Sequence, residues 1–98
     1  MINDASNDPP PATRYRRLDG VIETELDTEL ILLDPASQAM FSLNAVGARI
    51  WRLLDSANDA AIVAAVVTDF DVDDATASRD VAVLLGQLAE AGLLVVGG

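Results

Sequence analysis

The chain has 98 residues, with 6 basic and 16 acidic side chains and no histidine, so its formal net charge is −10. All of the basic residues are arginine and cysteine is absent. This composition excludes a disulfide, a thiolate metal site, a cysteine or lysine nucleophile and a histidine base. The apolar fraction of 51% predicts one packed domain. The acidic surface disfavours nucleic-acid partners, because it repels phosphates.

The N-terminal residues differ in character from the rest of the chain. Residues 1–13 are polar and include three consecutive prolines, so we predict a disordered tail before a domain over 14–96. The start lacks the basic and apolar regions of a signal peptide. The longest apolar run, residues 60–67, is far shorter than the about 20 residues that cross a bilayer. We therefore expect a cytoplasmic protein without membrane contact.

The first two strand-like segments suggest a hairpin. Asp19-Gly20 separates residues 15–18 from residues 21–26, and both turn positions tolerate positive φ, which favours a tight hairpin. In the second segment Ile22, Thr24 and Leu26 alternate with two glutamates. This alternation predicts a strand with one buried face.

The next two strand-like segments differ in their apolar pattern. Residues 29–33 follow an Asp27-Thr28 turn and are apolar on both faces, as is typical of a central strand. Residues 34–37 form a predicted turn. Residues 38–43 then place Ala39, Phe41 and Leu43 on one face of a last strand, and Met40 and Ser42 on the other.

Residues 44–92 show helical periodicity in three stretches. Asn44 is suited to cap a first helix, whose apolar stripe consists of Val46, Ile50, Leu53 and Leu54. Gly47 lowers helix stability, so we expect it to permit a close contact. A second helix is expected over about 59–68.

The third helix is expected over about 73–91, because Asp73 and Asp74 suit a helix N-terminus. Gly92 is suited to end it in a Schellman motif, with Leu93 touching Leu88. We expect a short terminal strand over residues 93–96. The predicted fold is α+β and winged-helix-like, with a small N-terminal antiparallel sheet of three to four strands followed by three helices.

Catalytic and metal sites are disfavoured. Asp69, Asp71, Asp73 and Asp80 match four positions of a calcium loop, but Asp74 occupies the position that requires glycine. An acidic loop leading into a helix is the preferred interpretation. No base is present to activate a serine. We therefore expect no enzyme activity, no metal and no cofactor.

Two binding functions remain open. A winged-helix DNA-binding transcriptional regulator is one, although its recognition helix would carry four acidic residues against Arg79 alone. Peptide binding is the other, because an edge strand over 38–43 would leave unpaired backbone groups. Val83 lies on the polar flank of the third helix, with Asp80 and Gln87. Periodicity leaves open whether Val83 lines a groove or is an isolated surface residue.

The stretch Leu33-Asp34, Met40-Phe41-Ser42-Leu43-Asn44, Trp51 and Leu53-Leu54-Asp55 resembles the PqqD-like family of peptide chaperones, or RiPP precursor peptide recognition elements. Asp80-Val81 and Ala91-Gly92-Leu93 resemble the family's last helix and its Gly-Leu ending. Together with Phe70-Asp71-Val72-Asp73, these last two motifs are most similar to the stand-alone leader-binding proteins of lasso-peptide biosynthesis. The chain departs from the family in two places: Ser56-Ala57-Asn58 stands where many members have glycine, and Phe41 where they usually have tyrosine.

The resemblance implies a non-catalytic protein that binds the leader of a ribosomally made precursor peptide. The leader would lie as an added strand on the third strand of the family sheet, beside the third helix, for delivery to a maturation enzyme such as a leader peptidase. The residues implied for binding are the strand Ala39, Met40, Phe41, Ser42 and Leu43, the helical wall Val83, Leu84 and Gln87, and Asp80 for a polar or basic leader group. Two alternatives stay open: Phe41 and Leu43 could equally belong to the core, and Asp80 could equally be a surface charge of the helix. An interaction subunit whose sheet edge pairs with an enzyme is a further alternative.

Overall fold

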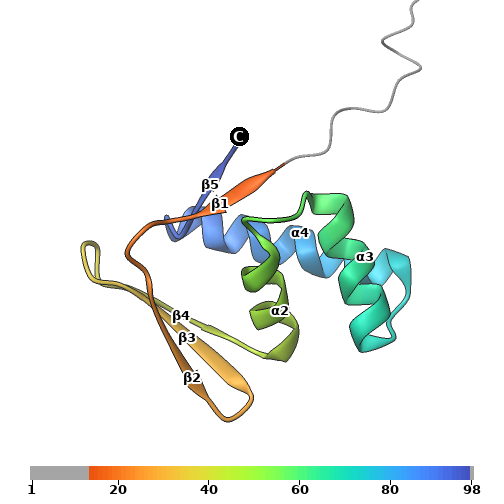
Figure 1. The fold of residues 1–98 in the computed structure, drawn as a ribbon, viewed down its shortest axis with the longest axis horizontal. Helices are drawn as coiled ribbons and strands as arrows, with labels where there is room; N and C mark the ends of the chain where they lie inside the picture. The colour runs from red at the N-terminus through yellow and green to blue at the C-terminus, as the bar shows by residue number, and fades with distance from the viewer. Residues whose placement is uncertain (1–13, 98) are drawn as a thin grey trace, which may run out of the picture.

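The computed structural model describes residues 14–97, so the predicted tail over 1–13 lies outside it. Three helices follow a small antiparallel sheet, as predicted for an α+β fold (Figure 1). The elements are β1 (Tyr15–Arg17), β2 (Ile22–Leu26), β3 (Glu29–Asp34), β4 (Ala39–Leu43), α2 (Ala45–Leu53), α3 (Asp59–Phe70), α4 (Asp74–Glu90) and β5 (Leu94–Val96).

The main sheet has the strand order β2-β3-β4, and both pairs are antiparallel. The predicted central strand is therefore β3, and β4 is an edge. The turn between β3 and β4 is organised by Asp34, whose carboxylate accepts hydrogen bonds from the Ala36 N–H (3.2 Å) and the Ser37 hydroxyl (2.7 Å). These bonds explain how Asp34 is accommodated at 7% exposure.

The hairpin predicted between β1 and β2 is wrong. Gly20 does adopt a positive φ of 86°, but β1 pairs with β5 in a separate two-stranded sheet, with Tyr15 opposite Val96. The backbone N–H of Leu18 also donates to the Leu93 carbonyl at 3.0 Å. The predicted terminal strand is therefore confirmed as β5. It pairs with β1, whereas the Asp19-Gly20 turn was expected to pair β1 with β2.

The face predicted to be buried on β2 is exposed. Ile22 and Leu26 are 49% and 54% exposed, because the helices cover the other face of the sheet, where Leu30 and Leu32 are buried. Glu23 lies opposite buried Leu32 and accepts hydrogen bonds from the Trp51 indole (2.8 Å) and Arg17 (3.2 Å). All five residues of β2 are exposed, so neither of its faces is buried and the prediction of one buried face is wrong. The glutamates lie on the helix side, where Trp51 and Arg17 donate hydrogen bonds to Glu23.

Side-chain caps define the starts of the helices. Asn44 accepts from the Gly47 N–H at 2.9 Å, Asn58 from Ala61 at 2.8 Å and Asp73 from Thr76 at 2.7 Å. The predicted cap at Asn44 and the predicted start of α4 are therefore confirmed. At the end of α4, Gly92 has φ 75° and the Leu93 N–H donates to the Leu88 carbonyl at 2.9 Å, as expected of a Schellman motif.

One core joins the helices to the inner face of the main sheet. Its fully buried members are Trp51, Leu30, Leu32, Ile50, Leu54, Ile62, Leu88, Leu93, Val66 and Val81. The close contact expected at Gly47 is with Leu43, since a Cβ there would lie 3.1 Å from Leu43 Cδ2. Gly47 therefore lets the end of β4 pack directly on α2. Within residues 14–97, no helix is long and apolar enough to cross a membrane.

Candidate functional site

A groove of about 390 Å³ runs between β4 and α4, and the start of α2 closes one end. Seven of the nine predicted binding residues line it, whereas Ala39 and Met40 lie on β4 outside it. The lining residues are Phe41, Ser42, Leu43, Asn44, Val46, Gly47, Ile50, Arg79, Asp80, Val83, Leu84 and Gln87.

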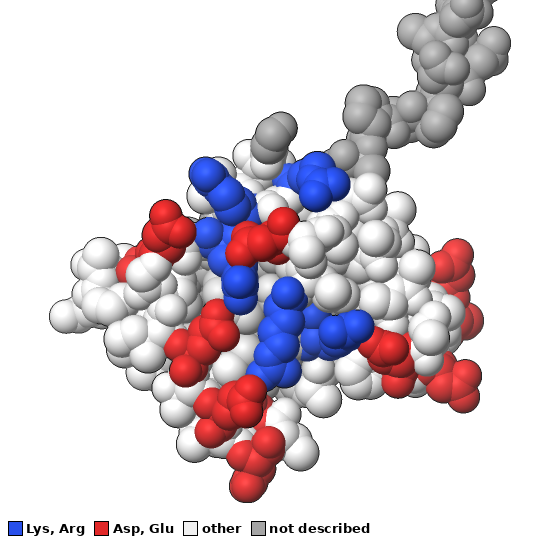
Figure 2. Space-filling view, viewed as in Figure 1, with Lys and Arg blue, Asp and Glu red and all other residues white. Residues whose placement is uncertain are grey.

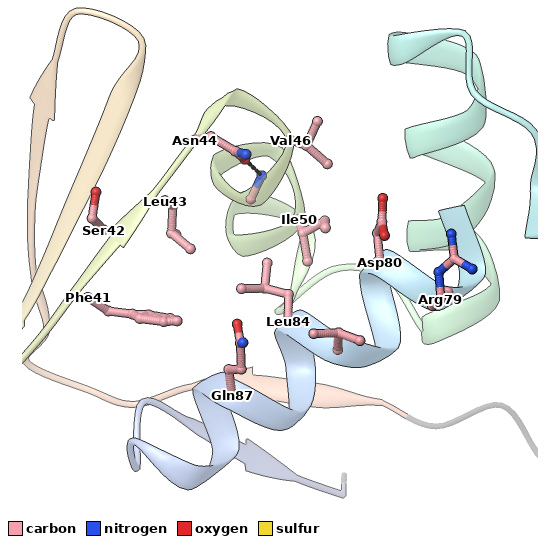
Figure 3. Close-up of a pocket in the computed structure, with 12 residues that line it drawn as sticks. Phe41, Ser42, Leu43, Asn44, Val46, Ile50, Arg79, Asp80, Leu84 and Gln87 are labelled. Carbon is pink, nitrogen blue, oxygen red and sulfur yellow. Dashed lines mark hydrogen bonds between the residues drawn. The ribbon is translucent and has the colours of Figure 1, made fainter. Parts of the chain in front are cut away.

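The β4 wall follows the predicted alternation. In Figure 3, the Phe41 ring extends from β4 toward Leu84 and Gln87 of α4, whereas the Ser42 side chain points away from the groove. Leu43 is only 2% exposed and belongs to the core, while half-buried Phe41 both packs against the core and lines the groove. Phe41 is thus the aromatic residue of this wall that a ligand can reach.

The α4 wall is formed by residues one turn apart. Asp80, Val83, Leu84 and Gln87 share one helix face, because their spacings are i, i+3, i+4 and i+7. Val83 is 54% exposed and Leu84 is half-buried. The structure therefore places Val83 on the groove wall, which resolves the alternative that the periodicity had left open.

Five of the residues that line the groove were not predicted to bind a ligand. Asn44, Val46, Gly47 and Ile50 contribute from α2, where they were assigned only to capping, to the apolar stripe and to a close contact. Arg79 lies beside Asp80 at the start of the helical wall. The groove therefore combines an apolar centre with side chains of both charges near one end.

The β4 edge gives the groove an additional recognition element. β4 pairs with β3 on one side, and among the described residues no strand pairs with its other side. Backbone N–H and C=O groups along such an edge are available to an added strand. The alternate side chains of that strand would enter the groove, because side chains on a strand alternate between its two faces.

Three of the six arginines form ion pairs outside the groove. Figure 2 shows blue side chains gathered over β1 and α2 with red ones between and around them. Arg17 contacts Asp55 (2.8 Å), Arg49 contacts Asp69 (2.7 Å), and Arg52 contacts Glu25. The backbone N–H of Arg17 holds the pKa of the Asp55 carboxyl below its ordinary value. Arginines already paired with carboxylates make a poor phosphate-binding surface.

The acidic loop before α4 uses its carboxylates for other contacts. Asp69 pairs with Arg49, and Asp73 caps α4, where hydrogen bonds from Thr76 lower the pKa of Asp73. In the part of the chain that the structure describes, no group of three or more carboxylates is arranged to hold a metal ion.

Comparisons with known proteins agree on one family. The family model described as "Coenzyme PQQ synthesis protein D (PqqD)" matches residues 29–94. A solved structure of TbiB1 in complex with the TbiA(beta) leader peptide is 36% identical, with a TM-score of 0.73 over 81% of this chain and 93% of that one. A lasso peptide synthetase B1 complexed with the leader peptide is 29% identical, with a TM-score of 0.73 over 84% of this chain and 98% of that one. Among curated proteins no match was found.

Proposed function

Because the chain belongs to the PqqD family, we propose that it binds the leader of a ribosomally synthesised precursor peptide as a strand added to β4. The observation that carries the proposal is the unpaired β4 edge beside an apolar groove. Two similar solved structures, at 36% and 29% identity, are complexes with leader peptides. Backbone pairing supplies affinity, and the groove selects which side chains are accepted.

We assign the following roles to the predicted residues. The backbone of residues 39–43 pairs with the leader, and its groove-facing side chains pack between Phe41 on one wall and Val83 and Leu84 on the other. Asp80 receives a polar or basic group, and Gln87 offers an amide. The net charge of −10 repels an acidic leader, so apolar anchors and backbone hydrogen bonds supply most of the affinity.

The proposed role is delivery and not catalysis. The chain contains no histidine or cysteine, and its basic residues are all arginine, so the groove offers no nucleophile with an activating base. The bound precursor would pass to a maturation enzyme such as a leader peptidase, in lasso-peptide biosynthesis, in the cytoplasm where ribosomes make it. The DNA-binding alternative has no support from the comparisons.

Fluorescence polarisation with a labelled leader, taken from a short open reading frame beside the gene, tests the proposal. We expect saturable binding that persists in added salt, and none to a labelled DNA duplex. Ser42→Pro removes one backbone N–H from β4. If that N–H points outward, the variant loses about tenfold or more in affinity and keeps its fold, because proline is tolerated at sheet edges.

Thermal unfolding of the same variant is the control for the fold. A variant that remains folded and binds the leader with unchanged affinity contradicts strand addition at Ser42. Preferential binding of the DNA duplex over the leader would instead support the alternative function, a winged-helix DNA-binding regulator.

A further inference from the structure

The main sheet has a second exposed surface, on the side away from the helices. The strand register places Ile22, Leu33 and Met40 in one row across the three strands, and Thr24, Ile31 and Ser42 in the next. Leu26 and Glu29 face each other at the end. These eight residues are called the outer sheet face below.

The outer sheet face is apolar where a solvated face is usually polar. Ile22, Leu26 and Met40 are 49%, 54% and 70% exposed, and Ile31 and Leu33 are partly exposed between them. Glu29 is the single charged residue of the set, on a chain whose net charge is −10. Apolar residues contiguous on one exposed sheet face favour an interaction surface over a fully solvated one.

A second copy of the chain is a poor occupant for this surface. Three strands of five or six residues span about 14 Å by 17 Å, or roughly 240 Å² of footprint, whereas each partner buries about 800 Å² in a standard stable interface. Two copies, each with a net charge of −10, would also repel one another. The outer sheet face is therefore large enough to form only one part of a larger interface.

We propose that the outer sheet face, extended by the bound leader, is the docking surface for the maturation enzyme that receives the precursor, through an apolar and uncharged patch on that enzyme. This inference rests on the proposed function. A leader strand on β4 sends every second side chain into the groove and the others to the outer side, next to Met40. The row of Ile22, Leu33 and Met40 is thereby lengthened by one leader residue.

The composite surface couples the two binding events. An enzyme seated on it touches both the protein and the precursor, so it binds the leader-loaded chain more tightly than the empty chain. By linkage, the enzyme raises the affinity for the leader by the same factor. The docking surface therefore distinguishes loaded from empty chains without any change in the fold.

The double variant Ile22→Thr/Leu26→Thr tests the docking surface. Both positions lie on β2, at the sheet edge opposite β4, and threonine retains strand propensity. The matched control is Val95→Thr/Val96→Thr, which removes two valines that are 41% and 59% exposed on β5, in the other sheet. The probes are the labelled leader and a leader peptidase taken from an open reading frame beside the chain's gene, with binding measured by biolayer interferometry.

We expect the β2 double variant to bind the leader with a Kd within about twofold of wild type, and to bind the enzyme about tenfold more weakly when loaded. The β5 control leaves both affinities unchanged. The inference is overturned if the β2 variant binds the enzyme as tightly as wild type does. It is also overturned if the leader does not change the affinity of wild type for the enzyme. Dimerisation of wild type in sedimentation, abolished in the β2 variant, reassigns the surface to a second copy. Failure of wild type to bind the leader refutes the proposed function instead.

Discussion

Val83→Asp separates leader binding from folding, because Val83 lies on the groove wall and is 54% exposed. That exposure leaves roughly 80 Å² for a ligand to cover, which corresponds to about 2 kcal/mol, or about 30-fold in Kd, at about 25 cal/mol per Å². An aspartate at this position must also lose water beside an apolar ligand, which adds to the loss. We therefore expect leader affinity to fall by about 30-fold or more.

The stability of the variant should scarcely change. Valine and aspartate have similar helix propensities. The new carboxylate is attracted by Arg79, one turn away, and repelled by Asp80. The two interactions cancel to within roughly a few tenths of a kcal/mol. We expect a change of less than about 0.5 kcal/mol, or about 3 °C in Tm.

The assay for Val83→Asp is leader titration by fluorescence polarisation, together with thermal unfolding. Ala75→Asp is the matched control, because it adds the same charge to the first turn of α4 at an exposed position outside the groove. It should bind the leader like wild type. Equal losses of affinity and stability in Val83→Asp would assign Val83 to the core, and normal affinity in a folded variant would show that the leader does not cover this wall.

Four further substitutions probe the scaffold. Gly47→Ala places a Cβ 3.1 Å from Leu43 Cδ2. The overpacking costs about 1–3 kcal/mol and outweighs a helix-propensity gain of about 1 kcal/mol, so we expect both Tm and leader affinity to fall. The control Gly86→Ala should instead raise Tm, because its Cβ would meet nothing within 4 Å. Leu93→Ala removes a fully buried side chain and should cost about 2–5 kcal/mol in denaturant unfolding. The lowered pKa of Asp55 stabilises the fold above the ordinary carboxyl value of 3.8 and this contribution is lost as pH falls below it. Asp55→Asn should therefore be slightly less stable at pH 7 and converge with wild type in acid; parallel unfolding curves at every pH would contradict that assignment.

Local patterns predicted most of the elements around the groove. The alternation over β4, the capping residue Asn44 and the glycine at the end of α4 act within a few residues, and the structure confirms each of them. The walls of the groove were named from the family resemblance, and the structure brings Phe41 and Leu84 together across it. Their role in binding stays a prediction until the leader is titrated.

The errors came from interactions between distant parts of the chain. Nothing local to the Asp19-Gly20 turn indicates that Tyr15 pairs with Val96, because strand partners far along the chain leave no periodic signal. The orientation of β2, with its glutamates toward the helices and no buried face, depends on Trp51 and Arg17, which reach Glu23 only in the folded chain. Arg79 and Val46 were not predicted to line the groove, because α2 and α4 come together beside β4 only in the folded chain.

The pairing of β1 with β5 has a consequence for how the domain can be joined to other proteins. The antiparallel register sets Tyr15 beside Val96, so the chain enters and leaves the domain at one place (Figure 1). The β4 edge belongs to the other sheet, so a tether at either end leaves that edge open. A short flexible linker to an enzyme would hold a loaded leader near its active site at an effective concentration of about millimolar. The same module can therefore serve as a separate carrier or as a fused domain without redesign of its binding surface.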